Sequence, residues 1–130
     1  MTKATRPPAL VALLFGLSLP LTQVAQAATP APSRSEINSL LQALQTSACQ
    51  FNRNGSLYTA AEARDHMSRK VEYIENHGGF KSTETFIELV ATKSSMSGQA
   101  YQVRCGQEPA MPSAQWMAQT LKNLRRTKSP

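Results

Sequence analysis

Apolar residues recur at helical spacing along two stretches of this chain. They return every three or four positions, as expected for side chains that share one face of a helix with about 3.6 residues per turn. The first stripe follows Ser33 and consists of Ile37, Leu40, Leu41, Leu44 and Ala48. The second follows Thr59 and consists of Ala63, Met67, Val71 and Ile74. Both stretches are predicted to be amphipathic helices that pack on one face.

Capping signals mark the ends of these helices. Ser33 with Glu36, and Thr59 with Glu62, have the three-residue separation of a capping box. The pair Gly78-Gly79 predicts the end of the second helix, because glycine readily adopts the left-handed conformation found there.

Two further helices are predicted nearer the C-terminus. Ser82 caps a helix that runs to about Thr92, and its inner face consists of Phe86, Ile87 and Val90. Ser113 caps the last helix, which carries on one side Trp116, Met117, Thr120, Leu121 and Leu124.

Alternation with a period of two replaces the helical spacing at Tyr101, Val103 and Cys105, which predicts a short strand. Such a strand needs a partner, and residues 49–52 are the candidate. Asn54-Gly55 is the strongest turn signal in the chain. The predicted fold class is therefore mainly α, with about four short helices and a small two-stranded β element.

The first 27 residues have the pattern of a secretory signal peptide. Basic residues precede an apolar run over 9–21, and Ala25 and Ala27 stand at the positions that signal peptidase reads. The run is shorter than the roughly 20 apolar residues of a spanning helix. We expect cleavage after Ala27, a mature chain that begins at Ala28, no membrane segment after cleavage, and a periplasmic location.

The mature chain is predicted to hold one domain. Residues 28–34 are expected to be a flexible leader, 35–126 a single compact domain and 127–130 a tail. Cleavage removes Lys3 and Arg6, leaving 12 basic against 8 acidic residues and a net charge of +4. No surface combining clustered aromatic and basic residues is indicated, so nucleic acid is not an expected partner.

The chain has two cysteines, Cys49 and Cys105. In an exported protein they are expected to form a disulfide. A closed loop of roughly 57 residues corresponds to about 4 kcal/mol of stabilisation in the chain-entropy model. Nothing resembles the Cys-x-x-Cys motif of a catalytic dithiol.

Three polar segments form a candidate binding site if they converge in the fold. Its residues are Arg53, Asn54, His66, Lys70, Ser94, Ser95, Ser97, Gly98 and Tyr101. A guanidinium, an ammonium, an imidazole and several hydroxyls suit an anion such as a carboxylate, a phosphate or an acidic sugar. The alternative is structural: Arg53 pairs with Glu62 or Glu88, His66 binds a loop carbonyl, and the serines satisfy a helix end.

Catalytic and metal-binding signals are weak. A small hydrolase with His66 as base and a loop serine as nucleophile is an alternative, although spacing places no acidic group to orient the imidazole. His66 and His77 have no ligand spacing and no acidic or cysteine cluster beside them, so neither metal nor cofactor is expected. We favour a non-catalytic binding or envelope-accessory module for a small anionic ligand or an envelope component.

Two blocks of sequence resemble the YfeK-like family, which comprises short exported proteobacterial proteins with a domain of unknown function. The first block is Phe51-Asn-Arg-Asn-Gly55, Tyr58-Thr-Ala-Ala-Glu62-Ala63, His66-Met67 and Lys70. The second is Ser82-Thr-Glu-Thr-Phe-Ile87, Ala91, Ser94-Ser95-Met-Ser97-Gly98, Tyr101 and Val103. The resemblance implies a periplasmic location and a compact, mainly helical fold, but no activity.

A shorter likeness concerns Ser97-Gly98-Gln-Ala-Tyr101, which is similar to the Ser-Gly-x-x-Tyr loop of periplasmic lysozyme inhibitors. It implies an inhibitor-like interaction protein as a further alternative. Those inhibitors are β-barrels, whereas this chain is predicted to be mainly helical.

Overall fold

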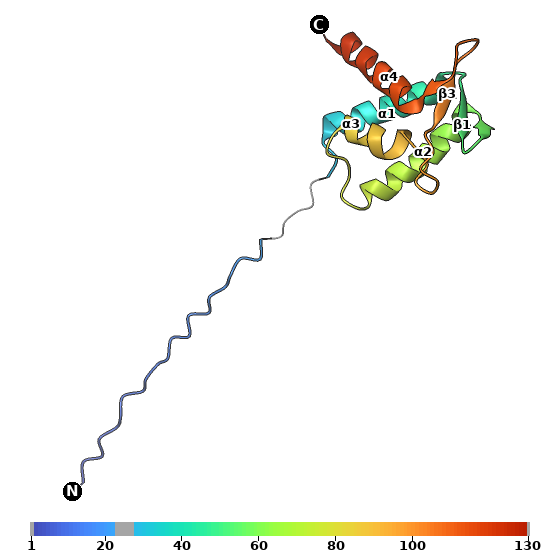
Figure 1. The fold of residues 1–130 in the computed structure, drawn as a ribbon. Coiled ribbons are helices and arrows are strands. Elements are labelled where there is room, and N and C mark those ends of the chain that lie inside the picture. Colours follow the sequence, from blue (N-terminus) through green and yellow to red (C-terminus); the bar gives the residue numbers. More distant parts are fainter. Residues whose placement is uncertain (1, 23–27, 130) are drawn as a thin grey trace.

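The computed structural model describes residues 2–22 and 28–129 and contains four α-helices and a small sheet (Figure 1). The strands of the sheet lie between helices along the chain. The helices are α1 (Ala31–Thr46), α2 (Ala60–Glu75), α3 (Thr83–Phe86) and α4 (Ser113–Lys128), with a π-helical turn η1 (Ile87–Ala91) continuing α3. The strands are β1 (Gln50–Arg53), β2 (Ser56–Tyr58), β3 (Gln102–Arg104) and β4 (Met111–Pro112).

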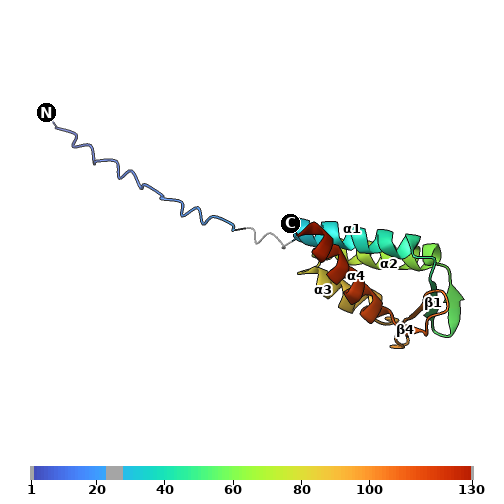
Figure 2. The ribbon, with the colours of Figure 1, turned by 90° about the horizontal axis from the view of Figure 1, so that it is seen from above.

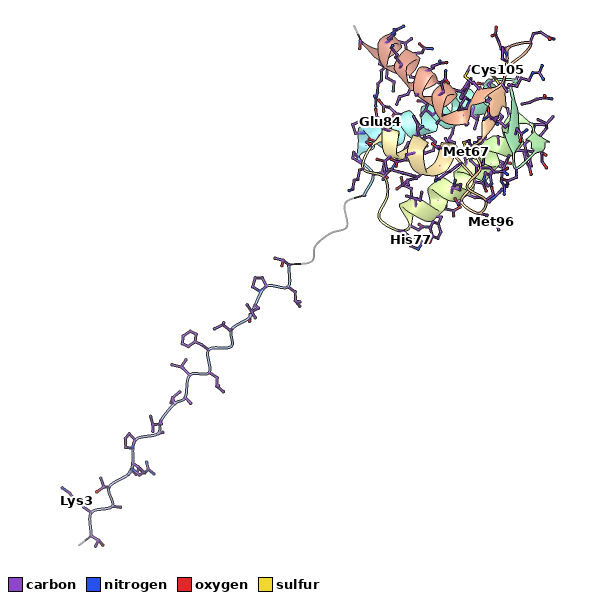
Figure 3. The ribbon with its side chains drawn as sticks, viewed as in Figure 1. Lys3, Met67, His77, Glu84, Met96 and Cys105 are labelled. Carbon is purple, nitrogen blue, oxygen red and sulfur yellow. A yellow bond between two sulfur atoms is a disulfide. The ribbon has the colours of Figure 1, made fainter. Side chains whose placement is uncertain are left out.

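Helix α1 forms the centre of the core, in contact with α2, α3 and α4, while the sheet lies at one end of the helices (Figure 2). The stripes predicted from the sequence supply the buried residues. Among the most deeply buried are Ile37, Leu40 and Leu44 from α1, Met67 from α2, Phe86 from α3, Val90 from η1 and Met117 from α4. Figure 3 shows Met67 in the interior, whereas Met96 lies on the outside.

The sheet is larger than the two-stranded element predicted. Its order is β2-β1-β3-β4, and all neighbours are antiparallel. The expected pairing of β1 with β3 is confirmed, with Phe51 opposite Val103. The left-handed turn at Asn54 and Gly55 adds β2 by folding the chain back, and the stretch before α4 adds β4. These two strands have three and two residues, too few to establish a visible alternation.

The disulfide is confirmed. Cys49 and Cys105 are bonded across a sequence separation of 56 residues, and neither cysteine is free (Figure 3). The bond connects the residue before β1 to the residue after β3, and so fastens together the two central strands of the sheet.

The helix boundaries agree with the caps in part. The capping box of Thr59 and Glu62 is present, and the Ser82 side chain caps α3. The predicted cap at Ser33 is wrong, because α1 begins at Ala31 after Pro30 and no side chain caps it. Ser113 is the first residue of α4 rather than its cap.

The segment before α1 is folded rather than flexible. Thr29 is only 4% exposed; its hydroxyl donates to Glu75 Oε1 at 2.6 Å and accepts from the Phe80 N–H at 2.8 Å. The tail is also shorter than expected, since α4 extends to Lys128. The predicted cleavage residues Ala25 and Ala27 lie outside the described residues. Among those described, no helix is long and apolar enough to span a membrane.

Candidate functional site

A pocket of about 240 Å³ lies between the β1–β2 hairpin and α2, and it contains three of the predicted site residues. These are Arg53 at the end of β1, His66 in the middle of α2, and Tyr101 just before β3. The remaining lining residues are Phe51, Asn52, Tyr58, Glu62, Ala63, Asp65, Met67 and Arg69. The pocket therefore combines apolar walls with several charged groups.

The three predicted residues are connected through the imidazole of His66. Its Nδ1 lies 3.4 Å from Arg53 Nη1, and its Nε2 lies 3.1 Å from the Tyr101 hydroxyl. A guanidinium can only donate hydrogen bonds, so Nδ1 must accept. A neutral imidazole then carries its proton on Nε2 and donates it to the tyrosine oxygen. The O–H hydrogen of Tyr101 is thereby left to be donated elsewhere.

The charge state of His66 agrees with this arrangement. Burial, followed by the positive charges of Arg53, Lys70 and Arg69, lowers the pKa of His66 from its ordinary 6.5 to about 4. Burial raises the pKa of Tyr101. At neutral pH both rings are therefore uncharged, and the positive charge next to them belongs to Arg53.

Arg53 is not neutralised by an acidic residue. Within residues 2–22 and 28–129, no carboxylate lies within 4.0 Å of its guanidinium, so the expected structural pairing with Glu62 or Glu88 is wrong. Its Nε is buried and has no hydrogen-bond partner in the same described residues. The Tyr58 ring centroid is 6.0 Å from the guanidinium carbon. Arg53 therefore retains N–H groups and a net charge with which to bind a ligand.

Lys70 does not line the pocket. Its Nζ donates to the Val90 carbonyl at 3.1 Å and to the Lys93 carbonyl at 3.4 Å, and it lies over the Tyr101 ring, 5.5 Å from the ring centroid. Burial, and to a smaller extent the charge of Arg53, lowers the pKa of Lys70. Lys70 is not a pocket residue, but its charge adds to the positive potential at His66.

The turn at Asn54 and the serine loop of residues 94–98 are joined by hydrogen bonds beside the pocket. The Asn54 amide donates to Ser94 Oγ at 3.5 Å, and its oxygen accepts from Ser97 Oγ at 2.5 Å. Gly98 has a φ of +72°, which lets the loop turn back. Ser95 is exposed. These five residues do not line the pocket, so the structure divides the predicted site into a part that lines the pocket and a part that lies outside it.

The hydrolase alternative requires a serine beside His66. Both ring nitrogens of His66 instead face Arg53 and Tyr101, and the side chains of Ser94 and Ser97 bind Asn54. The inhibitor-like interaction through the loop of residues 97–101 stays a prediction, and Tyr101 at its end is buried. Among the described residues, no group of three or more His, Cys, Asp or Glu side chains could hold a metal ion.

The pocket also contains residues that the sequence reasoning did not assign to it. Glu62, Asp65, His66 and Arg69 follow the spacing i, i+3, i+4 and i+7, which places them along one side of α2. This helical spacing was the sequence signal from which their place beside His66 could have been predicted. The apolar residues Phe51, Tyr58 and Met67 gave none, because core residues and pocket walls have the same composition.

The fold and the pocket together define a small, disulfide-linked domain of four helices and a four-stranded antiparallel sheet, so the predicted mainly α class is only partly right. The chain belongs to a family of unknown function (DUF5329), whose model matches residues 31–125. The match therefore includes every helix and strand except the last turn of α4, and all residues that line the pocket. No curated protein and no solved structure matches the chain.

Proposed function

We propose that this protein is an exported, non-catalytic binding module that holds a small ligand with an anionic group in the pocket between the β1–β2 hairpin and α2. The observation that carries the proposal is the guanidinium of Arg53, which lines the pocket and has no carboxylate within 4.0 Å among the described residues. A partly buried charge that has no carboxylate partner within the described residues is best explained by an external anion.

The hydrogen-bond chain supports the same reading. Arg53 supplies N–H donors and a positive charge, and Tyr101 supplies an O–H donor because its oxygen already accepts from His66. Donors of this kind suit the oxygens of a carboxylate or a phosphate. Phe51, Tyr58 and Met67 supply apolar contact for the rest of the ligand.

Export and a periplasmic location are part of the proposal. The charged start, the short apolar run and the small residues at Ala25 and Ala27 support cleavage before Ala28. A disulfide that joins the two central strands fits an oxidising compartment. The resemblance to the YfeK-like exported proteins supports the same location.

The test compares an acid with its neutral amide on the purified domain. We expect 3-phenylpropionate at millimolar concentration to raise the melting temperature, and 3-phenylpropanamide to raise it less. Arg53→Gln should weaken binding of the acid at least tenfold, as expected from loss of a charged hydrogen bond of about 1.5–3 kcal/mol.

Arg104→Gln is the matched control, because Arg104 is an exposed arginine of the neighbouring strand β3 and does not line the pocket. It should bind the acid as the unaltered protein does. Equal responses to acid and amide, or an Arg53→Gln protein that still binds the acid, would contradict the proposal.

A further inference from the structure

The wall of the pocket formed by α2 changes charge along its length. Glu62, Asp65, His66 and Arg69 all line the pocket, and their spacing places them on one face of α2. The two carboxylates come from the N-terminal half of this face, and Arg69 comes from the turn beyond His66. The negative end of the wall and the positive groups at Arg53 and Arg69 therefore border the same cavity.

Neither carboxylate is fully occupied by the protein. Glu62 uses Oε2 in the capping box, where that atom accepts from the backbone N–H and the hydroxyl of Thr59 at 2.8 and 3.1 Å. Its other oxygen, Oε1, accepts no hydrogen bond from the described residues. Asp65 is exposed, and the one basic group within 4.0 Å of it in the described part of the chain is Arg64, at 3.6 Å. Both side chains can still receive a cationic group.

A ligand with only a negative charge would fit this wall poorly. It would gain from Arg53 and Arg69 but would also approach Glu62 and Asp65, and like charges at close range oppose binding. A ligand with both charges matches both ends of the cavity. The volume of about 240 Å³ lies below the roughly 300–1,000 Å³ of pockets for drug-sized molecules, so the ligand must be small.

On the basis of the proposed function, we infer that the ligand is a zwitterion, an apolar amino acid or dipeptide. Its carboxylate binds Arg53 and the Tyr101 hydroxyl, and its ammonium group lies towards Glu62 and Asp65. Its apolar side chain packs against Phe51, Tyr58 and Met67. The acidic residues act in this scheme as the specificity determinants, because they separate a zwitterion from a simple acid.

The experiment uses three compounds with one apolar body and different charges. Phenylalanine carries both charges, 3-phenylpropionate carries only the carboxylate, and phenethylamine carries only the ammonium group. Isothermal titration calorimetry of the disulfide-bonded domain at pH 7 should give a Kd for phenylalanine at least tenfold lower than for either analogue. Arg53→Gln should weaken the binding of phenylalanine as well as that of the acid.

A double variant separates specificity from general binding. Glu62→Gln with Asp65→Asn should bring the Kd values of phenylalanine and 3-phenylpropionate within threefold of each other. Glutamine can still serve in a capping box, so the start of α2 is retained. Glu72→Gln is the matched control, because Glu72 is an exposed acid of the same helix that does not line the pocket. It should keep the preference for phenylalanine.

The outcomes distinguish this inference from the function on which it rests. If 3-phenylpropionate binds as tightly as phenylalanine and depends on Arg53, the zwitterion is overturned and the anion site stands. If phenethylamine binds most tightly, or if the double variant keeps the full preference, the inference is overturned. If none of the three compounds binds, both the zwitterion and the anion site are overturned.

Discussion

Two arginines on different parts of the molecule, Arg125 and Arg53, differ in whether they have carboxylate partners. Arg125 of α4 donates from Nε and Nη2 to Glu36 at 3.0 and 2.9 Å, and from Nη1 to Glu84 at 2.6 Å. Arg53 has no carboxylate within 4.0 Å in the described part of the chain. Arg125 is half-exposed and fully paired, whereas Arg53 is partly buried and unpaired.

The difference separates a structural charge from a binding charge. The Arg125 cluster connects α4 to α1 and to α3, and Thr83 adds a hydrogen bond to Glu36. The hydrogen bonds that Arg125 donates lower the pKa of both Glu36 and Glu84. At the other site, burial and, after it, the charge of Arg53 lower the pKa of His66. The presence of a carboxylate partner, rather than burial, distinguishes the two sites.

The largest expected effect concerns the disulfide, which holds the strands on which the pocket depends. Replacing both cysteines, with Cys49→Ser and Cys105→Ser, should lower the free energy of unfolding by about 2–4 kcal/mol. Urea denaturation followed by circular dichroism measures this change. A variant as stable as the unaltered protein would show that the hydrogen bonds of β1 and β3 suffice without the bond.

The second effect tests Arg125 as a structural charge. Arg125→Met should lower the free energy of unfolding by about 1–2 kcal/mol, since it leaves Glu36 without its bidentate partner while solvent screens part of the loss. The deficit should be present at pH 7 and should shrink as pH falls below about 4.5, because the two carboxylates have depressed pKa values and lose their charge in that range. Melting curves at pH 7 and pH 3.5 measure both; a deficit unchanged at pH 3.5 would contradict the ion-pair explanation.

The third effect tests His66. The folded state holds its imidazole neutral down to about pH 4, whereas the unfolded chain protonates it near pH 6.5. Lowering the pH through this window therefore favours the unfolded chain, and the protein loses stability as the pH falls from 6.5 to 4. His66→Gln should reduce this loss, by less than about 1 kcal/mol because the ring is partly solvated. An identical pH dependence for His66→Gln and the unaltered protein would contradict the assignment.

The smallest expected change concerns the stability of the Arg53 variant. Arg53→Gln should alter the ligand-free free energy of unfolding by less than about 0.5 kcal/mol, because no ion pair is broken. Chemical denaturation without ligand measures it. A loss comparable to that of Arg125→Met would place Arg53 in the same structural class and remove the contrast between the two arginines.

Spacing and residue type predicted several features of the fold, although the cap at Ser33 was wrong. The helical stripes, the capping box at Thr59 and the disulfide follow from spacing and residue type, and the pairing of β1 with β3 follows from the disulfide. Strands β2 and β4 were missed because two or three residues carry no period. The burial of Thr29 depends on Glu75 and Phe80, which are far away in the sequence.

The candidate site was predicted from the sequence only in part. Arg53, His66 and Tyr101 do meet, because strand pairing brings β1 beside β3 while α2 packs against β1. The destinations of Lys70 and Asn54 were not predictable. The partners of both residues come from η1 and the loop that follows it, which are distant in the sequence. The packing of these segments decides that Lys70 binds a backbone carbonyl and that Asn54 binds serine side chains.

The contact between Thr29 and Gly79 bears on the proposed cleavage after Ala27. Gly79 has a φ of +77°, and a Cβ added there would lie 2.6 Å from both the backbone nitrogen and the hydroxyl of Thr29. With cleavage after Ala27, Thr29 becomes the second residue of the mature protein. A peptidase that cut two bonds further along would remove the hydroxyl that binds Glu75 and the Phe80 N–H. The cleavage proposed after Ala27 would therefore leave these contacts of Thr29 in place.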